Sequence, residues 1–125
     1  MDTIHLFAPS LGAFLVGFYF VFFGVWNACH WSPTKQVMSL KKIPSSALIL
    51  SIGITFQIIL GSLLMLGIYI QFAAIMLMPF TLIASFIFHD FWASEGELWR
   101  LNFIIFTSNL TCSLGALCLL AGGNI

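Results

Sequence analysis

Five polar side chains could together bind a small ligand, because they offer an imidazole, a guanidinium, two amides and an indole. They are His89, Arg100, Asn102, Asn27 and Trp92. Each can donate a hydrogen bond to a ligand oxygen, and the indole also offers an apolar wall. His89 is the strongest candidate, because imidazole titrates near neutral pH and ionisable groups in apolar helices are costly. Both a functional and a structural role fit it. The polar residues are too few for a complete soluble enzyme site, and we assign no catalytic residue.

Several of the remaining polar residues follow a helical repeat. Thr81, Ser85 and His89 recur every four residues, and Trp92 follows three later, so the sequence predicts that they share one stripe of a helix. Amides and hydroxyls in this setting commonly form hydrogen bonds between transmembrane helices. The residues to which we assign that structural role are Gln57, Asn109, Ser85 and Thr81.

The composition excludes a water-soluble domain. Of the 125 residues, 61% are hydrophobic and only 6% are charged, with a mean hydropathy of +1.09. A globular domain carries about 25% charged residues, so the solvent around this chain must be lipid. Four basic residues are too few for nucleic-acid binding. The three cysteines contain no CxxC pair, and we assign no metal site.

Four apolar stretches are each long enough to cross a bilayer, which takes about 20 residues. They cover residues of about 9–31, 44–67, 71–92 and 98–121. The segment between the first two is polar and is expected to be a loop, with Pro44 in the first turn of the second helix. Short connections predict an antiparallel, up-down-up-down four-transmembrane-helix bundle in a single all-α domain, residues 1–125.

Basic residues predict the orientation of this bundle. All of them lie in or beside the first and third loops: Lys35, Lys41, Lys42 and Arg100. The positive-inside rule places these loops in the cytoplasm and both termini on the extracytoplasmic side. The first apolar run lacks a basic start and a small-residue cleavage site, so we expect a retained helix rather than a removed signal.

Position along each span predicts depth. At about 1.5 Å per residue, Gln57 and Asn109 fall near the bilayer midplane. The residues expected nearer the cytoplasmic end are Asn27, His30, His89, Asn102 and Arg100.

Glycines predict where helices approach closely. Gly53 and Gly61 lie four residues on either side of Gln57, and Gly17 and Gly24 lie in the first span. Small residues at such spacings allow transmembrane helices to touch backbone to backbone.

Motifs in the second half of the chain resemble a known family. Residues 86–92 read FIFHDFW, residues 106–110 read FTSNL, and residues 114–123 read LGALCLLAGG. These segments resemble the DoxX family of small four-helix bacterial inner-membrane proteins, most specifically in the last two helices. The family often has an acidic residue where this chain has Gln57 and a Lys where it has Ser108.

The resemblance implies quinone-coupled redox chemistry or an oxidoreductase complex in a bacterial inner (plasma) membrane. We therefore expect an accessory, multi-pass subunit that is not an enzyme by itself and that lines a quinone or lipid site. The expected partners are the bilayer and other membrane subunits. A quinone is the only cofactor expected, and no covalently bound one is predicted.

Three alternatives remain. The 14 Phe residues also suit a structural scaffold, assembly or lipid-contact subunit without a site of its own. His30 and His89 are expected at one membrane level and could hold a haem or metal. A transporter fits less well, because the chain lacks paired broken helices in matching halves.

Overall fold

The computed structural model describes residues 2–122, and the side chains of residues 7–122. The described part of the chain is almost entirely helical and contains no strand. Four of its helical segments are long and apolar enough to cross a membrane: Phe7–Cys29, Ser46–Leu66, Ile70–Ala93 and Gly96–Gly122. The prediction of an all-α membrane protein with four spans is therefore confirmed.

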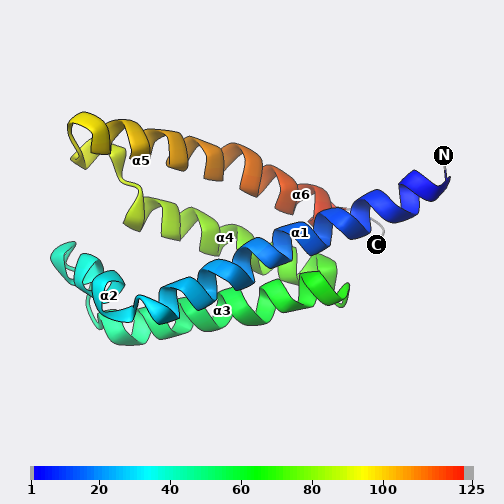
Figure 1. Ribbon diagram of the computed structural model, residues 1–125, viewed down its shortest axis with the longest axis horizontal. Helices are drawn as coiled ribbons and strands as arrows, with labels where there is room; N and C mark the ends of the chain where they lie inside the picture. The colour runs from blue at the N-terminus through cyan, green and yellow to red at the C-terminus, as the bar shows by residue number, and fades with distance from the viewer. Residues whose placement is uncertain (1, 123–125) are drawn as a thin grey trace.

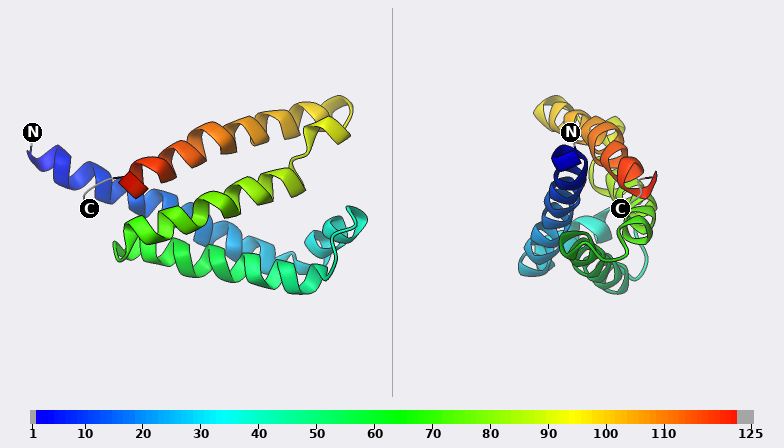
Figure 2. Two further views of the ribbon diagram at one scale, coloured as in Figure 1. Left: turned by 180° about the vertical axis from the view of Figure 1, so that it is seen from behind. Right: turned by 90° about the vertical axis from the view of Figure 1, so that its right-hand side faces the viewer.

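The spans form two hairpins that meet at the end of the molecule where α3 turns into α4 and that diverge towards the other end (Figures 1 and 2). α1 (Asp2–Cys29) lies beside α3 (Ser46–Leu66), and α4 (Ile70–Phe88) lies beside the last helix of the chain (Figure 1). The first turns of α1, the last described turn of the fourth span and the α3–α4 turn lie at one end of the molecule (Figures 1 and 2). The next helix after α1, α2 (Trp31–Leu40), and the start of α5 (Gly96–Ser108) lie at the other end, which we call the loop end (Figures 1 and 2).

Glycines bring α1 and α3 into backbone contact. A Cβ atom placed on Gly61 would lie 2.8 Å from the carbonyl oxygen of Gly17, and one on Gly24 would lie 3.1 Å from Cβ of Gln57. The first distance is shorter than real Cβ contacts and the second is tighter than most of them, so the predicted close approach is confirmed at these three glycines. Gly53 is different, because its added Cβ would meet only the Phe80 ring of α4, at 3.4 Å.

The polar segment after α1 is a helix rather than the expected loop. α2 (Trp31–Leu40) carries Pro33 in its first turn, where a missing N–H costs no hydrogen bond. Met38 is buried and anchors the helix, and the Ser39 hydroxyl donates to that of Ser46 at 3.3 Å. The prediction for Pro44 was also wrong, because α3 begins two residues later, at Ser46.

The fourth span is interrupted near its middle. α5 (Gly96–Ser108) passes into a π-helical turn, η2 (Asn109–Ser113), and continues as α6 (Leu114–Gly122). α4 packs closely along α6 and separates from α5 towards the loop end (Figure 1). The buried core lies where α1, α3, α4 and α6 meet. Its most enclosed residues are Leu64, Ala73, Ala74, Leu77 and Leu117.

Candidate functional site

Two of the predicted binding residues meet at the loop end. Nδ1 of His89 lies 3.3 Å from Oδ1 of Asn102, and Nδ2 of Asn102 donates to the Ser94 hydroxyl at 3.0 Å. Because Asn102 turns its oxygen to the ring, Nδ1 of His89 carries the proton in this arrangement. The Nε2 atom of a neutral ring is then left as an acceptor.

Local structure places His89 at the boundary between helix and loop. α4 ends at Phe88, and the backbone N–H of His89 bonds to the Ser85 carbonyl at 2.9 Å. A short 3-10 turn, η1 (Phe91–Ala93), follows, and Gly96 with φ of 63° begins α5. A left-handed φ favours glycine at this position. The reversal between α4 and α5 brings Asn102 back to the imidazole.

An ion pair connects the end of α2 to the segment that follows α4. Nζ of Lys41 lies 2.5 Å from Oδ1 of Asp90, and the two side chains are only 28% and 20% exposed. We name the five residues Lys41, His89, Asp90, Ser94 and Asn102 the loop-end cluster. Sequence reasoning missed Lys41, which it treated only as a marker of orientation. The first and third loops were predicted to lie on the same side of the membrane. This prediction could have suggested that Lys41, in the first loop, pairs with Asp90, beside the third.

The other predicted binding residues lie apart from the cluster. Nδ2 of Asn27 donates to Oε1 of Gln57 at 3.2 Å, which joins α1 to α3. Arg100 is exposed and lies 3.8 Å from Glu97 on its own helix. Of the five residues, the structure therefore brings together only His89 and Asn102.

Trp92 does not continue the α4 stripe as predicted. The helix ends four residues earlier, so the repeat that buries Thr81 and Ser85 stops at His89. Trp92 is 55% exposed, and its ring lies edge-on to Phe106 at 5.6 Å. It can still form the apolar edge of the loop end.

The deeper polar groups are mostly engaged within the bundle. Nδ2 of Asn109 donates to the fully buried Ser85 hydroxyl at 3.0 Å and so joins the fourth span to α4. Gln57 is buried in its pair with Asn27. Thr81 differs, because its buried hydroxyl has no hydrogen-bond partner among the described residues.

His30 is exposed and lies between α1 and α2. Its Nδ1 atom lies 2.9 Å from the Trp26 carbonyl oxygen. Its ring stacks on the Trp26 indole, with 4.3 Å between the ring centroids. The three cysteines are free and exposed. Within residues 2–122, no group of three His, Cys, Asp or Glu side chains is placed to hold a metal ion.

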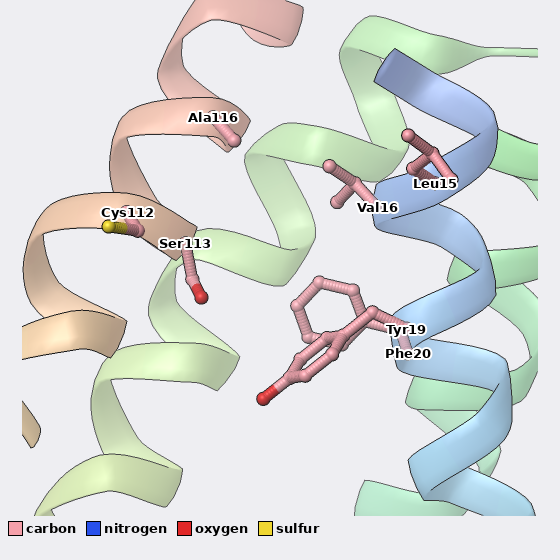
Figure 3. Close-up of a pocket in the computed structure, with 7 residues that line it drawn as sticks. All are labelled: Leu15, Val16, Tyr19, Phe20, Cys112, Ser113 and Ala116. Carbon is pink, nitrogen blue, oxygen red and sulfur yellow. The ribbon is translucent and has the colours of Figure 1, made fainter. Parts of the chain in front are cut away.

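A groove that the sequence did not predict lies between α1 and the π turn (Figure 3). It is open on one side and has a volume of about 230 Å³, and its walls are apolar apart from Tyr19, Cys112 and Ser113. A second hollow, of about 370 Å³, lies along α1 beside Trp26, Cys29 and His30. The only signal for the first groove was the polar position of Ser113 in an apolar helix.

Comparison with known proteins yields one family. A sequence profile of the DoxX family matches residues 11–90, which is more than half of the chain. The match includes Gln57, Gly61 and His89 and ends at Asp90, so the fourth-helix motifs lie outside it. No curated protein and no solved structure matches the chain. On the strength of the matched first three spans, the chain belongs to the DoxX family.

Proposed function

We propose that this DoxX-family protein is an accessory membrane subunit of a quinone-linked redox complex. In this proposal the loop-end cluster receives the quinone head group, and the redox centres belong to partner subunits. The observation that carries it is the half-buried His89 ring, held by Asn102 at the end of an apolar hairpin. Ionisable groups in that position are expensive and are commonly functional.

The cluster offers what a quinone head group needs. A quinone carbonyl accepts a hydrogen bond and a quinol hydroxyl donates one, and an imidazole can serve both because it changes protonation near neutral pH. Trp92, three residues after His89, packs against the buried Phe106 and adds apolar ring surface at the loop end. A few polar groups on an otherwise apolar surface are typical of small-molecule sites.

Replacing His89 tests this role. We expect His89→Ala to reduce quinone-dependent electron transfer in membranes at least about tenfold, as is common for loss of a proton-transfer group, with assembly of the complex intact. His30→Ala is the matched control, because that exposed ring contacts only Trp26, four residues earlier in the chain. Equal turnover in the two variants would remove the quinone role from the cluster.

We also propose an orientation within the bacterial inner membrane. The loop end carries Lys35, Lys41, Lys42 and Arg100, so the positive-inside rule supports a cytoplasmic loop end and extracytoplasmic termini.

A structural role is the second candidate, and one observation favours it. Large aromatic side chains project from α1 once per turn, and each is 43–51% exposed: Phe14, Phe18, Phe22 and Trp26. Such a row offers rigid apolar surface to lipid or to another helix. If His89→Ala keeps full turnover while Phe18→Ala together with Phe22→Ala releases the chain from its complex, the scaffold role is supported instead.

A further inference from the structure

The groove between α1 and the fourth span contains two hydroxyl groups in an otherwise apolar wall. Tyr19 and Phe20 of α1 face Ser113 and Ala116 across it. Figure 3 shows the hydroxyls of Tyr19 and Ser113 both pointing into the space between the helices. Phe20 also lines the groove and is buried, with its ring centroid 6.5 Å from that of Phe80 on α4.

Neither hydroxyl has a hydrogen-bond partner among the described residues. Five other hydroxyls in these spans behave differently, because each of the five donates to the carbonyl four residues earlier. They are Ser51, Thr55, Ser62, Thr107 and Thr111. Ser113 ends the π turn, which alters the helix phase and the position of nearby carbonyls. Such turns are frequent at functional sites.

The depth of the groove makes these free hydroxyls costly. Tyr19 is one residue past the middle of the span Phe7–Cys29. Ser113 is four residues, or about 6 Å, past the middle of the span Gly96–Gly122. An unpaired polar group in hydrocarbon costs several kcal/mol, and an acyl chain filling the groove would leave both hydroxyls unpaired.

We propose that this groove binds the head of a neutral, lipid-soluble molecule of one- or two-ring size that carries a hydrogen-bond-accepting oxygen. Tyr19 and Ser113 donate to that oxygen, and the apolar walls contact the ring. A cavity of about 150 Å³ is enough for benzene, so about 230 Å³ suits a somewhat larger ring system. A charged head is excluded by the cost of desolvation at this depth. The site is separate from the loop-end cluster and does not rest on the proposed function.

Benzophenone is a suitable probe, because it is a neutral two-ring ketone and forms covalent bonds to nearby C–H groups when irradiated. The full chain in lipid nanodiscs is irradiated with it, and the labelled peptides are identified by mass spectrometry. We expect saturable labelling of peptides containing Tyr19 and Ala116. Diphenylmethane, which has the same rings without the oxygen, should compete poorly. Labelling concentrated on the Trp26–His30 face, or equal competition by diphenylmethane, would overturn the proposal.

Conservative variants test the donors. Tyr19→Phe and Ser113→Ala should each weaken benzophenone binding about three- to fifteenfold, the range of a hydrogen bond inside a membrane protein. Tyr69→Phe is the matched control, because the chain's other tyrosine is exposed at the α3–α4 turn. Unchanged binding in both groove variants would show that the hydroxyls turn to protein groups instead, and the proposal would fail.

Discussion

Asn27 of α1 donates a 3.2 Å hydrogen bond to the side chain of Gln57 on α3, one turn from the point where Gly24 touches the same helix. The amide pair and the glycine contact depend on each other. Without the small residue, the helices could not approach closely enough for the two amides to meet. The first hairpin is thus held together by the Asn27–Gln57 hydrogen bond and by the backbone contact beside it.

Loss of the Asn27–Gln57 hydrogen bond should destabilise the hairpin modestly. Gln57→Leu leaves the Asn27 amide unpaired, and we expect a loss of about 0.6–1.7 kcal/mol in the free energy of unfolding. Reversible unfolding in mixed micelles measures it. The double variant with Asn27→Leu should cost less than the sum of the two single changes. Strict additivity would mean that the two amides do not interact.

Glycine substitutions separate close contact from general helix effects. Gly61→Ala places a methyl group 2.8 Å from the Gly17 carbonyl oxygen, so α1 and α3 must move apart. Overpacking of this kind costs about 1–3 kcal/mol. Gly115→Ala is the control, because nothing lies within 4 Å of its added Cβ, and Ala favours helix over Gly. A Gly61→Ala protein as stable as the Gly115→Ala protein would contradict the close packing.

The Lys41–Asp90 ion pair should both position α2 and stabilise the fold. Asp90→Asn is expected to lower the unfolding free energy by about 1.5–3 kcal/mol, because the two side chains are mostly buried and Lys41 loses a hydrogen bond to a charged group. It should also increase labelling of a cysteine placed at the buried Met38. The charge swap Lys41→Asp with Asp90→Lys should restore protection. Protection that persists in Asp90→Asn would show that α2 is held by other contacts.

Orientation is tested by membrane-impermeant thiol labelling. In a chain whose three native cysteines are replaced by serine, a cysteine at Lys35 should be labelled only after the inner membrane is opened. A cysteine at Tyr69, in the α3–α4 turn, should be labelled in intact spheroplasts. The reverse pattern would invert the proposed topology.

The sequence predicted the fold class well because lipid imposes a simple rule. Apolar stretches near 20 residues must be helices, since every backbone group in hydrocarbon needs an internal partner. The glycines at positions 17, 24 and 61 also predicted the closest contact. The polar segment before Leu40 was harder, because a short amphipathic helix held by one buried methionine gives little hydrophobic repeat.

The candidate site was only partly predictable. Helical spacing identified His89 as inward-facing, but it could not show which amide would reach the ring. Asn27 was grouped with His89 by depth alone, and depth does not distinguish one side of a bundle from another. The Tyr19–Ser113 groove depends on a π turn, for which the residues around Asn109 give no clear local signal.

Extraction in mild detergent, followed by mass spectrometry and visible absorbance of the purified assembly, tests the accessory-subunit proposal most directly. We expect a partner that bears flavin, haem or iron–sulfur centres, with absorbance that a quinol changes in the native assembly and not in the His89→Ala assembly. A colourless chain purified alone or only with itself, from membranes that retain full quinone-dependent turnover when the gene is deleted, would contradict it.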